Sequence, residues 1–488
     1  MNTHPFTILH SNDIHGDFHA EVCGEKGDLI GGLSLLSGYI NQVRKEEENV
    51  LYVIAGDMVQ GSIIDAEYRG ISTVSIMNYL APDVVTLGNH EFDYGLPHLL
   101  FLEKLANFPI VNANLYIRQH NKRLMQPYHI IRMAGLDILF IGIITELVIT
   151  TINNDQTISS FISLEEASEE VGKITNAYKH DDIDLTILLT HIGFEADLEL
   201  AALLDPDWGV DMIIGGHSHT ILEEPARVND VLITQAGEGT KQIGRYDIIV
   251  DDDTNSIVEF DWELVPISKD TIQPDKDLQK YIDSYTEVVD AKYNSIVCKL
   301  STELTHPSRV EETSLGNLFA DALSEWDELD VMLLGSGSIR TPTLGPVVTL
   351  GDFMSCFPYK DTLISYTVDG KTLWRIFNHW MRPDNRTRRG ECYQVNAGVR
   401  AVYDDQKQSL AELWVKGKPV EDEALFTVGL QGYHANNSEA NLAVTMDELR
   451  LSGRSRVVAT CVQDLALEYL RAHQNFREQV EGRLVYIG

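Results

Sequence analysis

The stretch FTILHSNDIHGD, residues 6–17, joins a short apolar run to a group of polar side chains. Residues 6–9 are typical of a buried strand, and the polar residues follow where that strand should end. Four later stretches repeat this form, each passing from a Val-, Ile- or Leu-rich run into Asp, Asn or His: LYVIAGD (51–57), DVVTLGNH (83–90), LTILLTH (185–191) and DMIIGGHSH (211–219). With helix-length spacers between them, these runs predict an α/β fold whose polar groups gather at the carboxyl ends of the strands.

The polar residues at these strand ends are candidates to bind metal ions. A single Asp after a strand is usually a turn residue or a helix cap, and a single His is usually structural. Carboxylates, imidazoles and an amide together at five strand ends nevertheless favour a site for borderline divalent ions. The candidates are Asp13, His15, Asp57, Asn89, His191, His217 and His219.

Residues 1–265 form the first predicted domain. Besides the five runs above they contain a sixth apolar run at 136–144, and they end in segments typical of antiparallel strands joined by turns. Between Pro274 and Val297, apolar residues recur at helical spacing among many charges. This pattern predicts an amphipathic helix that links the first domain to a second one.

The second domain begins afresh near residue 300. We expect a helix over 314–326, a strand over 331–335, mixed strands after it and a helix near 455–475. Strands and helices do not alternate here as they do earlier, so this part is predicted to be a smaller mixed α+β unit. The predicted boundaries are 1–265 for the first domain, 266–299 for the helical linker and 300–488 for the second domain.

The charge of the chain limits its partners. There are 38 Lys and Arg against 74 Asp and Glu among 488 residues, a net charge of −36. This excludes a nucleic-acid binder that depends on phosphate neutralisation, but not a small phosphorylated substrate held by metal ions or a few Arg side chains. No apolar run is long enough to span a bilayer, so no membrane partner is expected, and the oligomeric state stays open.

Two features bear on location. The N-terminal residues show neither the cationic nor the apolar region of a secretory signal. The five Cys residues are odd in number and lack metal-type spacing, which favours isolated thiols in a reducing compartment. We therefore expect the protein to be cytoplasmic.

The polar motifs resemble those of a known enzyme family. DIHGD (13–17), GDMVQGS (56–62), GNHEFDYG (88–95), TH (190–191) and GGHSH (215–219) resemble, in order, the motifs of calcineurin-like binuclear metallophosphoesterases. ETSLGNL (312–318) and GSGSIR (335–340) resemble elements of the 5′-nucleotidase family, which includes UDP-sugar hydrolases and 2′,3′-cyclic nucleotide phosphodiesterases. The resemblance implies a four-layer metallophosphoesterase sandwich followed by a 5′-nucleotidase-type C-terminal substrate-binding domain.

The resemblance also implies a ligand set. Asp13, His15 and His219 would hold one ion. Asn89, His191 and His217 would hold the other, and Asp57 would bridge them. The two divalent ions, drawn from Mn, Zn, Co or Fe, would activate a hydroxide that attacks phosphorus in line with the leaving oxygen.

Two further residues match the catalytic pair of the family. His90 corresponds to its catalytic histidine, and Asp93 to the carboxylate that orients that histidine. Such a pair can protonate the leaving group or stabilise developing charge. Many family members have Gln where this chain has His219, a departure that bears on metal preference because either side chain can be a ligand.

The second domain supplies the predicted substrate residues. By resemblance, Arg309 and Arg340 would face the substrate phosphate, and Tyr359 and Tyr433 would stack on a nucleobase. Glu439 would accept a hydrogen bond from the ribose. The chain departs from the family motifs here, for example with Gly335 in place of Asn, and the two tyrosines are otherwise read as core or rim aromatics.

The resemblance and the complete set of ligand residues favour metal-dependent hydrolysis of nucleotide phosphate esters. One alternative is a hydrolase with another leaving group, namely a 2′,3′-cyclic nucleotide phosphodiesterase/3′-nucleotidase or a nucleotide-sugar hydrolase. A non-enzymatic alternative is a degenerate binding protein or scaffold that keeps the fold. The scaffold is disfavoured because every predicted ligand, as well as His90 and Asp93, is present.

Overall fold

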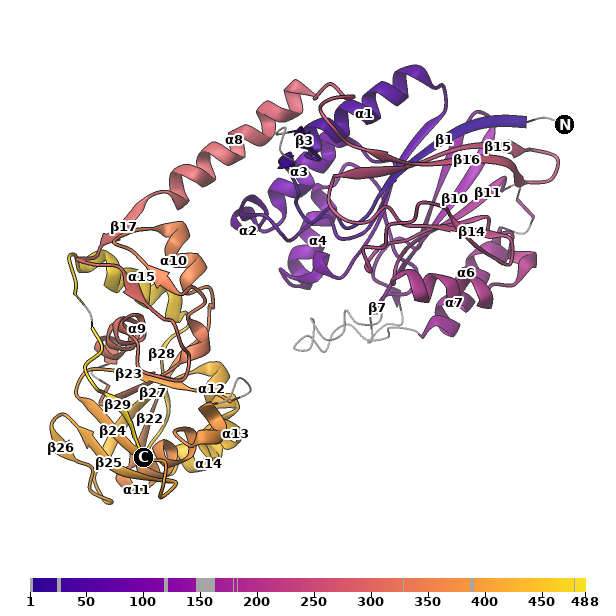
Figure 1. Ribbon diagram of the computed structural model, residues 1–488. Coiled ribbons are helices and arrows are strands. Elements are labelled where there is room, and N and C mark those ends of the chain that lie inside the picture. Colours follow the sequence, from indigo (N-terminus) through magenta and orange to yellow (C-terminus); the bar gives the residue numbers. More distant parts are fainter. Residues whose placement is uncertain are drawn as a thin grey trace. The chain divides into compact units, whose positions relative to one another are not determined.

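The computed structural model consists of two compact units, residues 1–289 and 290–488 (Figure 1). Each unit is considered by itself. Among the described residues, no helix combines the length and the apolar character needed to cross a membrane. The structure describes residues 3–23, 28–117, 122–145, 163–178, 180–181, 183–327, 329–386, 390–477 and 479–488.

The first unit contains two six-stranded sheets. The first sheet has the order β16 (Ser256–Pro266), β15 (Gln242–Asp251), β1 (Thr3–Ser11), β4 (Val50–Ala55), β5 (Val84–Thr86) and β6 (Ile110–Val111). The second has the order β13 (Ala226–Val228), β14 (Val231–Thr234), β12 (Met212–Ile214), β11 (Leu185–His191), β10 (Leu136–Ile144) and β9 (Tyr128–Met133). All six predicted apolar runs are strands of these sheets.

Both sheets are mixed. Strands β1, β4, β5 and β6 pair in parallel, as do β10, β11, β12 and β14. The predicted antiparallel tail is also present: β15 pairs with β16 and, on its other side, runs antiparallel to β1. The parallel strands therefore present their carboxyl ends together, as the sequence pattern predicts.

The main core of this unit lies between the sheets. Ile8 and Val53 of the first sheet and Phe140 and Leu189 of the second are members of one buried cluster. Because side chains alternate along a strand, their neighbours point the opposite way. In the second sheet these include Leu139 and Leu188, which pack with residues of α6 (Leu164–Ala177) and α7 (Phe194–Leu203).

Helices complete the outer layers. Helix α1 (Leu33–Glu46) contacts β4 and buries Leu36 and Ile40, and Figure 1 shows it on the side of the sheets opposite α6 and α7. Helices α2 (Ile63–Tyr68), α3 (Ile71–Leu80) and α4 (Leu96–Leu105) follow β4 and β5 in the chain, and α3 contacts both of the others. The result is the predicted four-layer α/β/β/α sandwich.

Helix α8 (Lys276–Tyr293) lies within the predicted linker. It buries Leu278, Ile282 and Val289, and two of its tyrosines contact helices of the first unit: the rings of Tyr285 and Tyr68 are 5.1 Å apart, and those of Tyr281 and Tyr79 are 6.5 Å apart. The boundary between the two compact units falls within this helix, after Val289, and so inside the linker predicted over 266–299. Most of the helix is thus part of the first unit.

The second unit is built on a five-stranded sheet of order β23 (Tyr393–Val395), β19 (Val331–Gly335), β27 (Leu425–Gln431), β22 (Leu363–Asp369) and β28 (Arg456–Ala459). A four-stranded sheet has the order β26 (Lys418–Pro419), β25 (Ser409–Val415), β24 (Val399–Asp404) and β29 (Leu484–Ile487). Two small pairs join β17 (Ile296–Lys299) to β21 (Val347–Thr349) and β18 (Leu304–Thr305) to β20 (Thr343–Leu344). This is the predicted mixed α+β unit.

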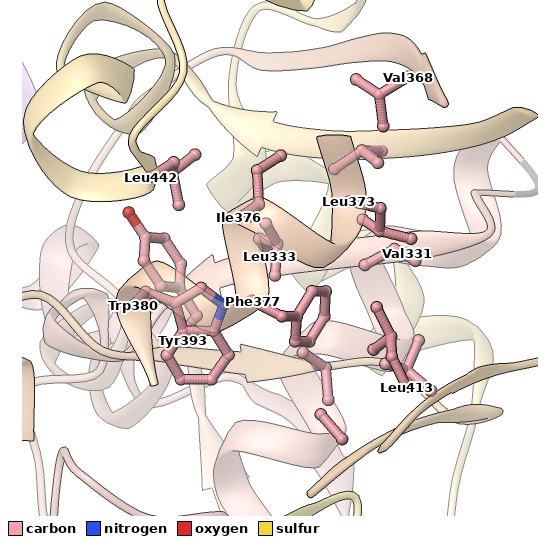
Figure 2. Close-up of a cluster of buried hydrophobic side chains, with 14 of the residues drawn as sticks. Val331, Leu333, Val368, Leu373, Ile376, Phe377, Trp380, Tyr393, Leu413 and Leu442 are labelled. Atoms are coloured by element: carbon pink, nitrogen blue, oxygen red, sulfur yellow. The ribbon is translucent and has the colours of Figure 1, made fainter. Parts of the chain in front are cut away.

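Helices pack on both faces of the five-stranded sheet. On one face, α11 (Gly370–Trp380) places Phe377 and Trp380 against Leu333 and, from the four-stranded sheet, Leu413 (Figure 2). On the other face, Met332 and Leu334 join a second cluster with α9 (Ser314–Ser324), α10 (Leu350–Cys356) and α15 (Val462–Ala472). Three short helices, α12 (Gly432–Asn436), α13 (Ser438–Leu442) and α14 (Met446–Leu449), follow β27.

Candidate metal centre

The predicted ligands lie at the carboxyl ends of five strands in the first unit. His191 is the last residue of β11, and the other six follow β1, β4, β5 or β12 within a few residues. The two sheets meet here, because Nδ1 of His191 donates a hydrogen bond to the carbonyl oxygen of Ala55 at the end of β4, 2.8 Å away. This bond fixes the proton on Nδ1 and leaves the Nε2 lone pair free to face the site.

Two groups of donor atoms form. In the first, His219 Nε2 is 3.3 Å from Asp13 Oδ1 and 3.2 Å from His15 Nε2. In the second, which comprises Asp57, His191 and His217, His191 Nε2 is 3.1 Å from Asp57 Oδ2. Within each group all the donor atoms lie within 4.8 Å of one another.

Asp57 stands between the two groups. Its Oδ2 atom is 4.0 Å from His15 Nε2 of the first group as well as 3.1 Å from His191 Nε2 of the second. A third cluster of possible ligands, His15, Asp57 and His90, shares two of these residues. This is the position that a bridging carboxylate requires.

The donor atoms fit divalent ions. Oδ1 of Asn89 and Nε2 of His191 are buried without a hydrogen-bond partner among the described residues. A buried polar atom without a partner costs free energy, so these two atoms are poised to bind a cation. Two carboxylates, four imidazoles and one amide make an O/N set, which suits Mn, Fe, Co or Zn.

The backbone at the site is strained. Five of the seven predicted ligands have positive φ angles: Asp13 52°, His15 51°, Asp57 53°, His217 81° and His219 53°. Each such residue costs about 1–3 kcal/mol, and such residues concentrate at functional sites. Hydrogen bonds between neighbouring loops keep the backbone in this conformation: Asp13 N–H donates to Gly56 O at 3.1 Å, and His15 N–H donates to Asp57 O at 3.0 Å.

Glycines allow the loops to approach each other this closely. A Cβ atom on Gly88 would lie 2.2 Å from Oδ1 of Asp57, and one on Gly56 would lie 2.6 Å from Nδ1 of His191. Neither distance is physically possible without a shift of the ligand. Glycine at these two positions is therefore a requirement of the site.

Glu91 is a site residue that the sequence analysis missed. Its buried carboxylate accepts hydrogen bonds from four backbone N–H groups, those of Asp57, Met58, Val59 and Gly88, at 3.0, 2.7, 3.3 and 2.6 Å. Burial, together with the nearby charge of Asp57, raises the pKa of Glu91 to about 7. Glu91 thus ties the loop after β4 to the loop after β5, and its only sequence signal was its place inside the motif GNHEFDYG.

The predicted catalytic pair is formed. His90 Nδ1 lies 2.8 Å from Asp93 Oδ2, and the backbone N–H of His90 donates to Asp57 Oδ1 at 2.8 Å. The hydrogen bond that His90 donates to the Asp93 carboxylate raises the pKa of His90, against the opposing effect of burial. The ring of His90 lies edge-on to that of His15, with centroids 5.3 Å apart.

A pocket of about 650 Å³ in the second unit collects four of the five predicted substrate residues. Arg309, Arg340, Tyr359 and Tyr433 all line it, together with Lys360, Asp361, Glu391, His434 and Asn436. Tyr359 and Tyr433 are 46% and 56% exposed, so they are not core aromatics. The Arg340 guanidinium lies 5.9 Å from the centre of the Tyr359 ring.

Glu439 does not line this pocket. Its exposed side chain lies in the first turn of α13, whereas the lining residues of this segment belong to β27 and α12, which ends at Asn436. Helix α12 presents Tyr433, His434 and Asn436 to the pocket, and the next helix, α13, begins before Glu439. Asn436 is thus the polar side chain that the structure offers in its place.

The position of His434 explains why this chain has Gly335 where the family motif has Asn. The imidazole is buried, its Nδ1 lies 3.1 Å from the Tyr393 hydroxyl, and burial lowers its pKa to about 4. A Cβ atom on Gly335 would lie 1.9 Å from Nε2 of His434. The histidine therefore fills the space that the family's Asn side chain would need.

The sandwich and its strand-end donors define a calcineurin-like phosphoesterase. The family model of that description matches residues 6–220, and the model for the 5′-nucleotidase C-terminal domain matches residues 295–445. A snake venom 5′-nucleotidase of Naja atra is 30% identical over 447 residues, which covers 82% of each chain. The chain belongs to the 5′-nucleotidase family.

Other comparisons agree. The 5′-nucleotidase of Mus musculus is 26% identical over 98% of this chain and 90% of its own. The crystal structure of a 5′-nucleotidase precursor from Thermus thermophilus has the same fold, with a TM-score of 0.60 over 99% of this chain and 100% of its own, at 24% identity. The predicted family, the two-domain α/β fold and the activity, metal-dependent hydrolysis of nucleotide phosphate esters, are confirmed. The comparisons do not favour the alternative activities or the scaffold.

Proposed function

We propose that this chain is a two-ion nucleotidase that cleaves the phosphate from nucleoside monophosphates. The ligand set carries this proposal: seven O and N donors gather in two groups that meet at Asp57. One ion would be held by Asp13, His15 and His219. The other would be held by Asn89, His191 and His217, with Asp57 bridging.

The ions and the protein have separate tasks. When bound, divalent ions neutralise phosphoryl charge and lower the pKa of water. The protein fixes the ligands through hydrogen bonds such as those of Glu91, and it keeps His191 in the tautomer that leaves Nε2 free. The strained backbone and these hydrogen bonds hold the ligand atoms in position before an ion binds.

His90 is assigned to the leaving group. Its Nδ1 is engaged by Asp93, so the proton available for transfer is the one on Nε2. Asp93 accepts the hydrogen bond of His90 Nδ1, which holds the orientation of the ring and favours its protonated form. We assign to His90 Nε2 the delivery of a proton to the leaving oxygen, or stabilisation of its charge.

The pocket of the second unit is proposed to bind the nucleoside monophosphate. Tyr359 and Tyr433 present exposed rings on which a base can stack, and Arg309 and Arg340 supply positive charge for a phosphate. Asp361 shapes the pocket, because its carboxylate accepts the Tyr433 backbone N–H at 2.9 Å. Asn436 takes the role that the sequence analysis gives to Glu439, which is to accept a hydrogen bond from the ribose.

Cytoplasmic location stays a proposal. It is supported by the five cysteines, all of which are free thiols in the structure, as is usual in a reducing compartment. Fractionation of the source cells, with antibody detection, tests it. Recovery of the protein outside the cytoplasmic fraction would contradict it.

The decisive experiment for the function is a substrate panel with defined metals. Chelated protein would be reloaded with Mn²⁺, Co²⁺, Zn²⁺ or Fe²⁺ and assayed on nucleoside 5′-monophosphates, a 2′,3′-cyclic nucleotide, a UDP-sugar and p-nitrophenyl phosphate. We expect metal-dependent turnover with the highest kcat/KM on a 5′-monophosphate. Preference for the cyclic diester or the nucleotide sugar would refute the monophosphate assignment, and two metals per chain are expected by elemental analysis.

A further inference from the structure

His219, the ligand position where many family members have Gln, has a partner of its own. Its Nδ1 atom lies 2.6 Å from Oε2 of Glu238, within hydrogen-bonding distance. Its other ring nitrogen, Nε2, faces Asp13 and His15 at 3.3 and 3.2 Å. One imidazole therefore joins the proposed first ion site to a carboxylate outside it.

The loop that carries Glu238 is fixed to the loop of Asp13. Asn12 accepts the N–H of Ala236 at 2.9 Å and donates to the carbonyl oxygen of Gly237 at 2.6 Å. On the other side of Glu238, the N–H of Gly239 donates to the carbonyl oxygen of Asp13 at 2.8 Å. Glu238 is thus placed by the same segment that presents the ligand Asp13.

A second anchor follows directly. The carboxylate of Asp17 accepts both the backbone N–H and the hydroxyl of Thr240, at 2.9 and 2.6 Å. The backbone is therefore held on both sides of Glu238, although its side chain is exposed. Such a short, bonded loop presents its carboxylate in a defined position.

The contact selects a tautomer. A carboxylate can only accept a hydrogen bond, so its place beside Nδ1 favours the proton there and leaves the Nε2 lone pair toward the ion site. Glutamine, the residue of many relatives, binds through an amide oxygen and has no tautomer to select. We propose that Glu238 is a positioning residue that makes His219 an effective metal ligand.

The contact between Glu238 and His219 contributes little to the stability of the fold. The Glu238 and His219 side chains are 63% and 37% exposed, and ion pairs this exposed contribute little to stability. The effect of Glu238 is therefore expected in metal affinity rather than in folding. This inference rests on the proposed metal centre, and the experiment distinguishes the two.

Metal binding to the chelated full-length protein tests the proposal. Mn²⁺ would be titrated calorimetrically into the wild type and into the Glu238→Ala, Glu238→Gln and Glu224→Ala variants. Glu224 is another exposed glutamate, on the segment between β12 and β13, and its removal changes the net charge equally. We expect Glu238→Ala to weaken one Mn²⁺ site about 10–100-fold. Glu238→Gln should retain part of the affinity through its amide oxygen, and Glu224→Ala should match the wild type.

A double-mutant cycle shows whether the effect passes through His219. In a His219→Gln background, adding Glu238→Ala should change the Mn²⁺ affinity less than twofold. Unchanged affinity in the single variant Glu238→Ala, or an equal loss in the His219→Gln background, overturns the inference alone. A wild type that binds no Mn²⁺ overturns the proposed metal centre with it. Thermal unfolding of the metal-free variants should match that of the wild type, because the contact is exposed.

Discussion

The backbone N–H of His90 donates a hydrogen bond to Oδ1 of Asp57, while the other oxygen of Asp57 faces His191 and His15. The proposed bridging ligand and the proposed catalytic residue are thus tied directly. A substitution at position 57 can preserve this hydrogen bond and still remove the charge. That possibility allows the two roles to be separated by experiment.

The first prediction concerns Asp57→Asn. The amide oxygen can still accept the His90 N–H, so the fold should persist, but one negative charge between two cations is lost. We expect both ions to bind weakly and turnover to fall to near background. Elemental analysis and circular dichroism check these outcomes, and a variant with two ions per chain and normal turnover would refute the bridge.

His90→Asn should behave differently. Metal content should remain near normal, because His90 follows a ligand in the chain without being one in the proposal. The expected loss in kcat is about 10²–10⁴-fold, the usual contribution of a positioned acid–base group. Steady-state kinetics with parallel metal analysis measure this. Asp93→Asn, which keeps a polar partner for the ring, should cost less, and an equal or larger loss there would contradict the orienting role.

Arg340→Ala should act on substrate capture. Because Arg340 lines the pocket of the second unit and lies over Tyr359, its removal should raise KM for a nucleoside monophosphate at least tenfold. KM for p-nitrophenyl phosphate, which lacks a nucleoside, should change less. Arg400→Ala, on the four-stranded sheet and paired with Glu412, is the matched control and should leave both values unchanged. Equal effects on the two substrates would argue against a nucleotide-binding role for the pocket.

Gly335 and His434 should be energetically coupled. Gly335 has φ −56°, which alanine can adopt, so Gly335→Ala is opposed only by the 1.9 Å approach of its Cβ to His434 Nε2. We expect it to destabilise the protein by about 1–3 kcal/mol, the typical cost of overpacking. In a His434→Ala background the same change should cost much less. Urea unfolding of the four proteins gives the coupling, and additive effects would show that the contact is not restrictive.

His10 should make the metal-free protein sensitive to acid. Burial lowers its pKa to about 3, and its ring stacks on Trp262 with centroids 5.4 Å apart. Because the folded-state pKa lies below the ordinary value of about 6.5, the unfolded chain binds the proton more readily. Stability should fall as the pH drops from about 6.5 toward 3, at up to about 1.4 kcal/mol per pH unit from this group. His10→Gln should flatten that slope in unfolding experiments, and an unchanged slope would exclude His10 as the cause.

Much of the fold and metal centre could be predicted because the signals are local. Each buried strand shows as an apolar run, and the parallel strands bring residues from 13 to 219 to one edge. The pairing of β15 with β1 was not predictable in this way, since it joins segments more than 200 residues apart. Local patterns carry no record of such a partner.

The missed residues share that limitation. Glu91 acts through four backbone N–H groups, and backbone groups have no sequence signature. Gly335 stands where the family motif has Asn, and the reason is His434, almost 100 residues away in the chain, which occupies the space beside the Gly335 Cα atom. Glu439 lies outside the pocket that the other four predicted substrate residues line, because α12 ends at Asn436, and a motif alignment does not show where a short helix ends.

The left-handed backbone at five of the proposed ligands has an evolutionary consequence. A non-glycine residue in this conformation lowers the stability of the chain, and only the need for a ligand at that place opposes its replacement. In a descendant that no longer needs the ions, glycine at positions 13, 15, 57, 217 or 219 would relieve the strain, and the gain in stability would favour its retention. Glycines at these positions would then mark a lineage that has lost catalysis, even where the sandwich itself is fully preserved.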